Sequence, residues 1–166
     1  MKTLLILRHA KSSWNDPTVD DHERTLNARG QKDAPRMGDL LRELRLVPDV
    51  IISSDAVRAQ LTTEAVAEAI GFTGEIRLDR QLYLAGPADI VAVLGTVETS
   101  AARTVMIVGH NPGLEQLVEL LTGEPNDLPT AALAQIALPI RRWRDLTAST
   151  RGRLVDLWRP KDLDSE

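Results

Sequence analysis

Cysteine is absent from this chain of 166 residues. Its absence excludes disulfides, thiolate metal sites and every phosphatase mechanism that uses a cysteine nucleophile. It also fits a protein of a reducing compartment. The chemistry of any reactive site must therefore come from other side chains.

Long hydrophobic runs are also missing. The apolar residues Leu4–Leu7 are stopped at once by Arg8, so they fall short of the roughly 7–15 apolar residues of a secretory signal. No other stretch approaches the ~20 apolar residues of a membrane span. We therefore expect a cytoplasmic protein without a membrane partner.

The chain has no strong excess of charge of one sign, since its formal net charge is -4. Such a balance argues against the broad basic surface that binds nucleic acid. The one basic run, "RRWR" at 141–144, is isolated in an acidic protein. We expect no nucleic-acid partner, and any bound anion must be held by a local basic cluster.

Three short apolar runs predict strands of a parallel sheet covered on both faces: Thr3–Leu7, Val50–Ile52 and Thr104–Val108. Helical patterns separate or follow them, and we place these at 28–46, 56–70, 87–97 and 112–121. The alternation predicts an α/β fold with an open, mostly parallel sheet and helices on both faces.

The last third of the chain predicts two further strands, at 132–139 and 152–160, with an antiparallel strand at one edge of the sheet. We interpret the segment between them, "IRRWRDLTAST", as an exposed turn region, with Trp143 more suited to packing. A single domain is expected over 1–160, followed by a polar tail over 161–166.

Each of the three predicted strands ends in polar residues. Arg8 and His9 follow the first, "SSDAVRAQ" the second and "GHNPG" the third. We expect a serine or Asp55 to cap the helix that carries Arg58, and Asn111 to cap the helix after His110. Ligands of doubly wound sheets bind at the carboxyl ends of the strands. Arg8, His9, Arg58 and His110, called the basic cluster below, should therefore meet at one edge.

The basic cluster suits a tetrahedral phosphoryl group. Guanidinium forks match phosphate oxygens, and helix N-termini attract anions. An imidazole between arginines, such as His9, can attack phosphorus and form a covalent phosphohistidine. The sequence has no G-x-x-x-x-G-K-[ST] phosphate loop and no residues at metal-ligand spacing. We therefore expect neither a metal nor another cofactor.

These residues resemble the histidine phosphatase superfamily, which has the phosphoglycerate-mutase-like fold. The similarity lies in "LRHAKS" at 7–12, "RTLNARG" at 24–30, "SSDAVRAQLTTEAV" at 53–66 and "VGHNPGL" at 108–114. The short chain together with "RHAKS" and "GHNP" is most similar to the SixA-type phosphohistidine phosphatases.

The resemblance implies that His9 is the phosphorylated nucleophile and that Arg8, Arg58 and His110 complete the catalytic phosphate pocket. It also suggests Arg24 as a substrate-binding residue. Ser12 and Asn111 are further candidates for substrate binding, although Ser12 is equally suited to a local backbone bond. Other polar residues near the motifs have simpler interpretations, with His22 as a solvated loop residue and Trp14 as packing of the loop.

The chain departs from the family pattern at one position. Larger members usually carry a glutamate after the third strand of the family fold, as general acid for a leaving alkoxide. In this sequence Tyr83 and Leu84 lie near that place. Imidazole, whose ordinary pKa is about 6.5, leaves far more easily than an alkoxide. The departure favours cleavage of P–N bonds, although four acids remain open as candidates: Asp20, Asp21, Glu23 and Glu75.

The sequence thus predicts a metal-independent phosphatase with a histidine nucleophile and a phosphohistidine intermediate. The expected substrate is phosphohistidine on a protein, such as a histidine phosphotransfer domain. One alternative is a phosphomonoesterase acting on a small phosphorylated metabolite. Another is a phosphoryl-binding module without turnover, although two intact histidines argue against it.

Overall fold

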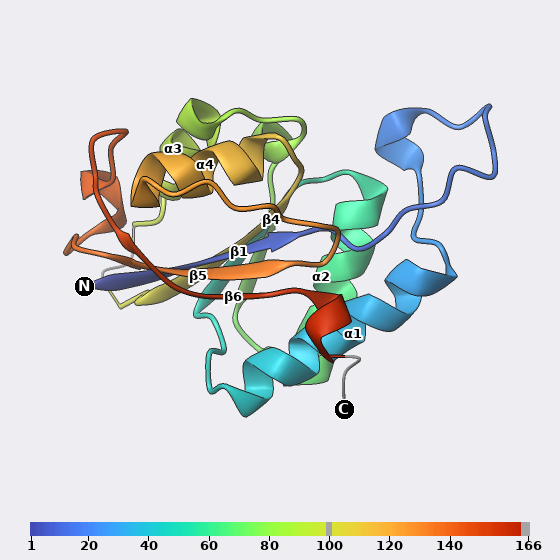
Figure 1. Cartoon of the computed structure of the whole chain (residues 1–166), viewed down its shortest axis with the longest axis horizontal. Helices are drawn as coiled ribbons and strands as arrows, with labels where there is room; N and C mark the ends of the chain where they lie inside the picture. Colours follow the sequence, from blue (N-terminus) through green and yellow to red (C-terminus); the bar gives the residue numbers. More distant parts are fainter. Residues whose placement is uncertain (99–100, 164–166) are drawn as a thin grey trace.

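The computed structural model describes residues 1–98 and 101–163. Within them, six strands form one sheet in the order β3-β2-β4-β1-β5-β6 (Figure 1). The strands are β1 (Lys2–Arg8), β2 (Val50–Ser53), β3 (Glu75–Leu78), β4 (Thr104–Gly109), β5 (Leu133–Leu138) and β6 (Arg153–Trp158). The four strands from β3 to β1 are parallel, whereas β5 is antiparallel to β1 and β6 to β5. The predicted α/β fold is confirmed.

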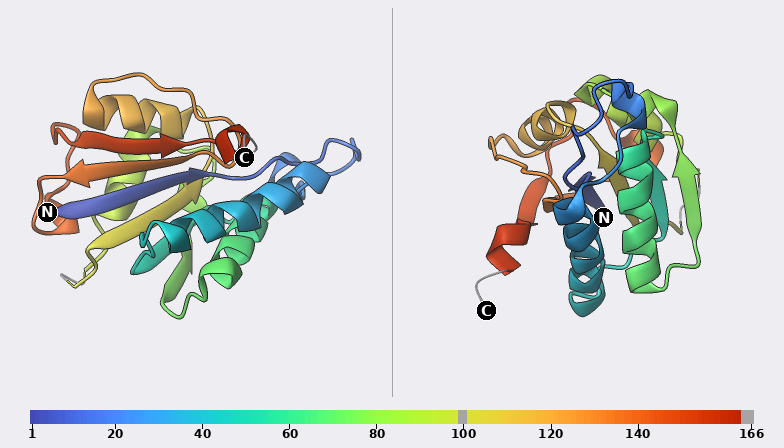
Figure 2. Two further views of the ribbon diagram at one scale, coloured as in Figure 1. Left: turned by 60° about the horizontal axis from the view of Figure 1, so that its bottom comes forward. Right: turned by 90° about the vertical axis from the view of Figure 1, so that its right-hand side faces the viewer.

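Helices cover both faces of the sheet, as predicted. Helices α1 (Ala28–Glu43) and α2 (Val57–Ile70) lie on one face, and α3 (Pro87–Leu94) and α4 (Gly113–Thr122) on the other (Figures 1 and 2). Successive side chains of β1 alternate between the two layers: Leu5 and Leu7 pack with α1 and α2, and Leu4 and Ile6 with α3 and α4. The apolar run at the start of the chain is therefore buried on both sides.

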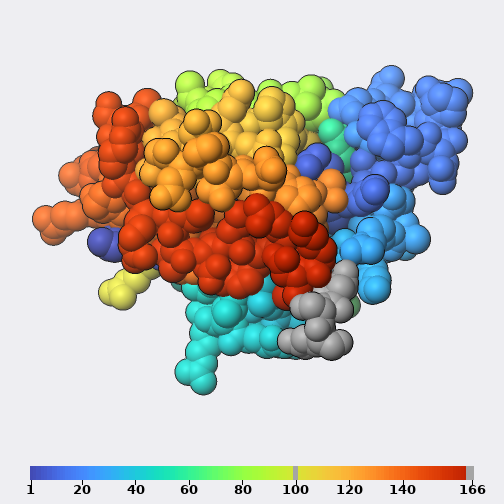
Figure 3. Space-filling view, viewed as in Figure 1, coloured from blue at the N-terminus to red at the C-terminus, as the bar shows by residue number. Residues whose placement is uncertain are grey.

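The segment between β1 and α1 stands out from the body of the molecule, coloured blue in Figure 3. It contains the short 3-10 helix η1 (Asp21–Glu23). The base of this segment is anchored at α1, where Asn27 caps the helix by accepting a hydrogen bond from the amide of Gly30 at 2.9 Å. Gly30 lies so close to the carbonyl of Lys11 that a Cβ would not fit. This contact fixes where the chain goes after β1.

Two sequence expectations about helix starts are wrong. Helix α2 has Ala56 as N-cap, and no side chain caps it. Helix α4 has Pro112 as N-cap; the Asn111 side-chain amide donates to the carbonyl of Leu128 at 2.8 Å, and its Oδ1, the atom that would cap the helix, has no partner among the described residues. Arg58 nevertheless lies in the first turn of α2, as predicted.

The sheet edge and the end of the chain also differ from expectation. Strand β3 was not predicted, because its apolar residues Ile76 and Leu78 are few and exposed. The segment 140–150 is not simply an exposed turn, since Ile140, Trp143 and Leu146 are buried and the Trp143 indole donates to the carbonyl of Ala102 at 2.7 Å. Trp143 is thus a packing residue, as predicted.

Residues Pro160–Leu163 form the 3-10 helix η4, whereas 164–166 of the predicted tail lie outside the described residues. The division into a domain over 1–160 and a tail over 161–166 stays a prediction. Across the described ranges, no helix is long and apolar enough to cross a membrane.

Candidate active site

The carboxyl ends of three parallel strands position the basic cluster. Arg8 is the last residue of β1 and pairs with Gly109, the last residue of β4, so His9 and His110 follow neighbouring strand ends. The His9 and His110 rings are 5.1 Å apart between centroids. Arg58 enters from α2 after β2 and contacts both rings. Sequence segments about fifty residues apart thus meet as the topology predicts.

The His9 imidazole is held in one orientation. Its Nδ1 lies 2.7 Å from the carbonyl oxygen of Ala10, which can only accept a hydrogen bond, so Nδ1 carries the proton. Its Nε2 accepts from Nε of Arg58 at 3.4 Å. Burial lowers the pKa of His9 to about 4, and the nearby guanidinium groups act in the same direction. At neutral pH the ring is therefore uncharged, and the electron pair of its unprotonated Nε2 is directed at Arg58.

The loop that carries His9 is tied to α2. The amide of Ala10 donates to Oγ1 of Thr62 at 2.9 Å, and that hydroxyl donates to the carbonyl of Arg58 at 2.8 Å. Thr62 is fully buried. It fixes His9 relative to Arg58, and its place one helical turn after Arg58 is the sequence signal that could have identified it.

His110 is held between Arg58 and Ser54. Its Nδ1 faces Nη2 of Arg58 at 3.4 Å, and its Nε2 lies 2.7 Å from Oγ of the fully buried Ser54. Burial, the neighbouring His9 ring and the Arg58 charge lower the pKa of His110 to about 3. Both histidines are thus neutral with no ligand bound.

Asp21 of η1 is a site residue that the sequence leaves as one of four open acids. Its backbone carbonyl and its Oδ2 accept from Nη1 and Nη2 of Arg58 at 2.6 and 3.0 Å. Partial burial alone would raise the pKa of Asp21, but hydrogen bonds from Tyr83 and Arg58 outweigh it and lower the pKa to about 2. Asp21 is therefore a carboxylate at neutral pH and has no proton to donate.

Arg24 joins the site through Asp21 and Ser12. Its guanidinium donates to Oδ1 of Asp21 at 3.1 Å and to Oγ of Ser12 at 2.6 Å. It also stacks on Trp14 at 3.4 Å, so Trp14 lies over a site residue while 75% of it is exposed. The predicted substrate-binding residues Arg24 and Ser12 are therefore adjacent, and Ser12 contacts a side chain rather than only backbone.

Arg8 and Asn111 meet at the carbonyl of Leu128. Nη1 of Arg8 donates to the carbonyl of Leu128 at 3.0 Å, and the Asn111 side-chain amide donates to the same oxygen. Nε of Arg8 and Oδ1 of Asn111 are buried without a hydrogen-bond partner among the described residues. Glu115, which sequence reasoning missed, holds the amide of Leu128 at 2.7 Å and lies close enough to act on the charge of Arg8.

Two of the other candidate acids, Glu75 and Glu23, lie away from the reactive groups. Glu75 begins β3, and so lies at the amino-terminal edge of the sheet. Glu23 is exposed and pairs with His22, whose other ring nitrogen contacts Asp55 at 2.8 Å. The expectation that His22 is simply solvated is therefore wrong. Its two hydrogen bonds to carboxylates raise its pKa, and it joins η1 to the start of α2.

The position after β3 is filled by Tyr83, which reaches the site. Its ring lies edge-on to His110 with 5.5 Å between centroids, and its hydroxyl donates to Oδ2 of Asp21 at 2.6 Å. Burial and the Asp21 carboxylate raise the pKa of Tyr83 above its ordinary value, so the phenol keeps its proton. The sequence marks Tyr83 only as a departure from the family pattern.

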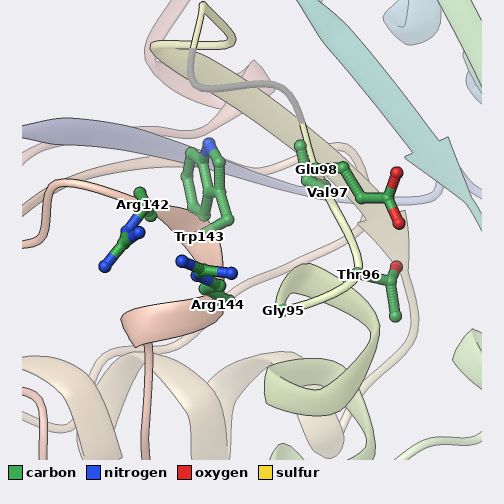
Figure 4. Close-up of a pocket in the computed structure, with 7 residues that line it drawn as sticks. All are labelled: Gly95, Thr96, Val97, Glu98, Arg142, Trp143 and Arg144. Carbon is green, nitrogen blue, oxygen red and sulfur yellow. The ribbon is translucent and has the colours of Figure 1, made fainter.

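A hollow near the other end of the sheet is separate from this cluster. A pocket of about 520 Å³ is lined by residues 95–98 and 142–144 (Figure 4). It adjoins Trp143, which is bonded to Ala102 just before β4 begins. The pocket therefore lies at the amino-terminal edge, opposite His9 and His110.

The charges at the site suit a phosphoryl dianion. The guanidinium groups of Arg8, Arg24 and Arg58 outnumber the nearby carboxylates, which are Asp21 beside Arg24 and Arg58 and Glu115 near Arg8, and both imidazoles are neutral. Net positive charge in a partly buried site stabilises phosphoryl oxygens. No set of three or more His, Cys, Asp or Glu side chains within the described ranges could hold a metal ion. Fold and site together define a phosphoryl-handling α/β protein with the phosphoglycerate-mutase-like fold.

Comparison with known proteins gives the family. The sequence model of the histidine phosphatase superfamily (branch 1) matches residues 4–83. An uncharacterised chloroplastic protein of Arabidopsis thaliana is 30% identical over 155 residues, which cover 89% of this chain and 71% of the relative. The chain therefore belongs to the histidine phosphatase superfamily.

Two comparisons point to one group within the superfamily. The crystal structure of the candidate phosphohistidine phosphatase SixA from Agrobacterium tumefaciens has a TM-score of 0.82 and 31% identity, covering 96% of this chain and 98% of that one. Phosphohistidine phosphatase SixA of Escherichia coli K12 is 25% identical over 138 residues, covering 81% of this chain and 84% of the relative. The chain is thus a phosphatase, a hydrolase acting on phosphoryl groups, and it is similar to SixA.

Proposed function

We propose that this phosphatase hydrolyses phosphohistidine on proteins through a phospho-His9 intermediate. The observation that carries the proposal is the orientation of His9, whose Nδ1 is bonded to the Ala10 carbonyl while Nε2 keeps its electron pair beside Arg58. A neutral imidazole nitrogen facing bound phosphorus is an activated nucleophile. The similarity to SixA supports the substrate class.

The first step transfers the phosphoryl group to His9. The Nε2 electron pair attacks phosphorus in line, the bond from phosphorus to the substrate nitrogen breaks, and its electron pair stays on the leaving imidazole. Arg8 and Arg58 stabilise the charge on the phosphoryl oxygens. Water protonates the other ring nitrogen of the substrate, so the leaving group departs as neutral imidazole, and the hydroxide left behind takes up the proton that the attacking water releases in the second step.

The second step regenerates the enzyme. Water attacks the phosphorus of phospho-His9, the P–Nε2 bond breaks, and inorganic phosphate leaves with neutral His9. Nδ1 of His9 remains hydrogen-bonded to the Ala10 carbonyl throughout, which keeps the reactive Nε2 in one place.

The surroundings of the leaving group favour P–N over P–O cleavage. Asp21 is the nearest of the acids considered, but three donors hold it ionised. Tyr83 keeps its proton at neutral pH and donates it in a hydrogen bond to Asp21. An alkoxide needs a general acid, whereas imidazole does not, so a small phosphate ester is the poorer substrate.

The test is a comparison of kcat/KM for a phosphohistidine peptide and for sugar phosphates at matched concentration. We expect the peptide to be preferred by at least about a hundredfold, the usual contribution of a general acid that esters lack here. Equal or better turnover of the esters would favour the metabolite phosphatase instead. A cytoplasmic location and a histidine phosphotransfer domain as the physiological partner belong to the same proposal.

A further inference from the structure

A continuous series of side-chain contacts runs through the site from Ser54 to the backbone carbonyl of Ala10. Ser54 Oγ contacts Nε2 of His110 at 2.7 Å, and Nδ1 of His110 faces Nη2 of Arg58 at 3.4 Å. Nε of Arg58 then reaches Nε2 of His9 at 3.4 Å, and Nδ1 of His9 ends on the Ala10 carbonyl at 2.7 Å. This series of contacts is nearly symmetrical about Arg58, with one imidazole on each side.

The guanidinium at the centre fixes the protons of the free enzyme. Arginine has only donors, so each ring nitrogen that faces Arg58 must be unprotonated. The proton of His9 is therefore on Nδ1, and the proton of His110 is on Nε2, where it is donated to Ser54. Both rings accept from Arg58 in this state.

Ala10 and Ser54, at the two ends of this series of contacts, differ in the hydrogen bonds that they can make. The carbonyl of Ala10 only accepts, so it holds His9 in a single tautomer with Nε2 unprotonated. The hydroxyl of Ser54 both accepts and donates, and it already accepts the Ala56 amide at 3.2 Å. One end thus fixes a nucleophile, and the other leaves its imidazole able to exchange donor and acceptor.

A bound phosphoryl group makes this difference matter, given the proposed function. The phosphoryl oxygens would draw Nη2 of Arg58 away from Nδ1 of His110. Nδ1 of His110 would then face a phosphoryl oxygen, which only accepts hydrogen bonds. If Nδ1 were unprotonated, its electron pair would repel that oxygen. His110 can serve such a substrate only if Nδ1 carries a proton.

We infer that Ser54 is a positioning residue that lets His110 change tautomer when the phosphoryl group binds. Nδ1 takes a proton from solvent and donates it to a phosphoryl oxygen, while Nε2 gives its own proton to solvent. The Ser54 hydroxyl turns to donate to Nε2 and keeps the Ala56 amide as its donor. The ring stays neutral and keeps its contact with Ser54, and the phosphoryl oxygen replaces Arg58 as the partner of Nδ1.

Ser53 supplies a matched control. It is the neighbouring serine, equally buried, and its Oγ donates to the carbonyl of Ser54 at 2.9 Å. Replacing Ser53 with alanine removes this local hydrogen bond and leaves the hydrogen bonds of His110 in place. Any effect of Ser54→Ala beyond that of Ser53→Ala therefore belongs to the contact with His110.

Kinetics of the variants give the first readout. Ser54→Ala is expected to lower kcat about tenfold or more with a smaller change in KM, as for a lost proton donor in the transition state. Ser53→Ala should stay within about threefold of the wild type. Ser54→Thr, which keeps a hydroxyl, should retain most of kcat. Equal losses in Ser54→Ala and Ser53→Ala would overturn the inference.

Nitrogen-15 NMR of the wild-type protein tests the tautomer without any variant. Free enzyme should show His110 protonated at Nε2, and the orthovanadate complex should show it protonated at Nδ1. A vanadate complex with an unchanged tautomer, or with both nitrogens protonated, would overturn the inference alone. A wild-type protein that neither binds vanadate nor hydrolyses phosphohistidine would overturn the proposed function and this inference with it.

Discussion

The hydroxyl of Tyr83 donates to Oδ2 of Asp21 at 2.6 Å, and the same oxygen accepts from Nη2 of Arg58 at 3.0 Å. One carboxylate thus connects the residue after β3 with the arginine that contacts both histidines. Because Asp21 lies in η1, the contact also ties the segment between β1 and α1 to the site. We therefore expect substitution of Tyr83 to change the hydrolysis of phosphate esters, and substitution of Asp21 to change the binding of phosphate.

Replacing Tyr83 with glutamate should raise the hydrolysis of phosphate esters. The carboxyl would stand beside Asp21, and two neighbouring carboxyl groups raise the pKa of one of them, which creates a proton donor. We expect kcat/KM for an alkyl phosphate to rise about tenfold or more. Tyr83→Phe, which removes the hydroxyl without adding an acid, is the control, and an equal rise in both variants would contradict the explanation.

Replacing Asp21 with asparagine should strengthen binding of inorganic phosphate. The carboxylate occupies Nη2 of Arg58 and repels a phosphoryl dianion, and asparagine removes its charge with little change of shape. We expect the inhibition constant of phosphate to fall severalfold. Asp20→Asn, a neighbouring acid whose side chain makes no capping bond, should leave it unchanged.

The sequence predicted the position of the reactive groups better than the contacts that hold them. The strands ending at Arg8, Ser53 and Gly109 contain nearly continuous apolar runs, so the sequence predicted these strands and a mostly parallel sheet. The motif residues after these strands then had to meet at one edge. That part follows from chain order alone.

Ser54, Asp21 and Tyr83 could not be assigned in the same way. Their roles depend on distances between side chains from separate elements, such as 2.6 Å between Tyr83 and Asp21. A polar loop with several acids gives no signal for which one turns inward. The failed cap at Asn111 has a similar cause, because the Asn111 amide donates to a tertiary partner, the Leu128 carbonyl, while its Oδ1 has no partner among the described residues.

The buried histidines should make the protein less stable in weak acid. The folded-state pKa values of His9 and His110, about 4 and about 3, lie below the ordinary value of 6.5. Between the folded-state values and 6.5, the unfolded chain therefore binds more protons than the folded protein. The contribution of the two neutral histidines to the free energy of unfolding is complete above pH ~6.5 and declines as the pH falls. We expect the unfolding temperature to decrease from pH 7 to pH 5.

Variants identify the groups responsible for this pH dependence. His110→Asn removes one buried titrating ring and should flatten the profile between pH 7 and pH 5. His22→Asn should act in the opposite sense, because the raised pKa of His22 adds stability at low pH that is lost as the pH rises through it. Because His22→Asn lacks this opposing contribution, an unfolding temperature of that variant that is constant over this range would contradict the burial of neutral imidazoles.

Replacing Arg58 with lysine should nearly abolish turnover. The guanidinium contacts His9, His110 and Asp21 through three different nitrogens, and a single ammonium cannot reproduce that fork. We expect kcat to fall about a hundredfold or more. Arg80→Lys, at an exposed arginine near Tyr83, provides the control and should change kcat little. Retention of more than a tenth of the activity by Arg58→Lys would contradict its central position.

Transfer of the phosphoryl group to His9 is the step on which the whole proposed mechanism depends. Rapid acid-free quenching of the enzyme during turnover of a phosphorus-32 phosphohistidine peptide, followed by peptide mapping, measures this directly. The expected result is a label on His9 that forms and decays as fast as turnover and is absent in His9→Ala, which should be inactive. Turnover without a labelled protein, or with the label on another residue, would contradict it.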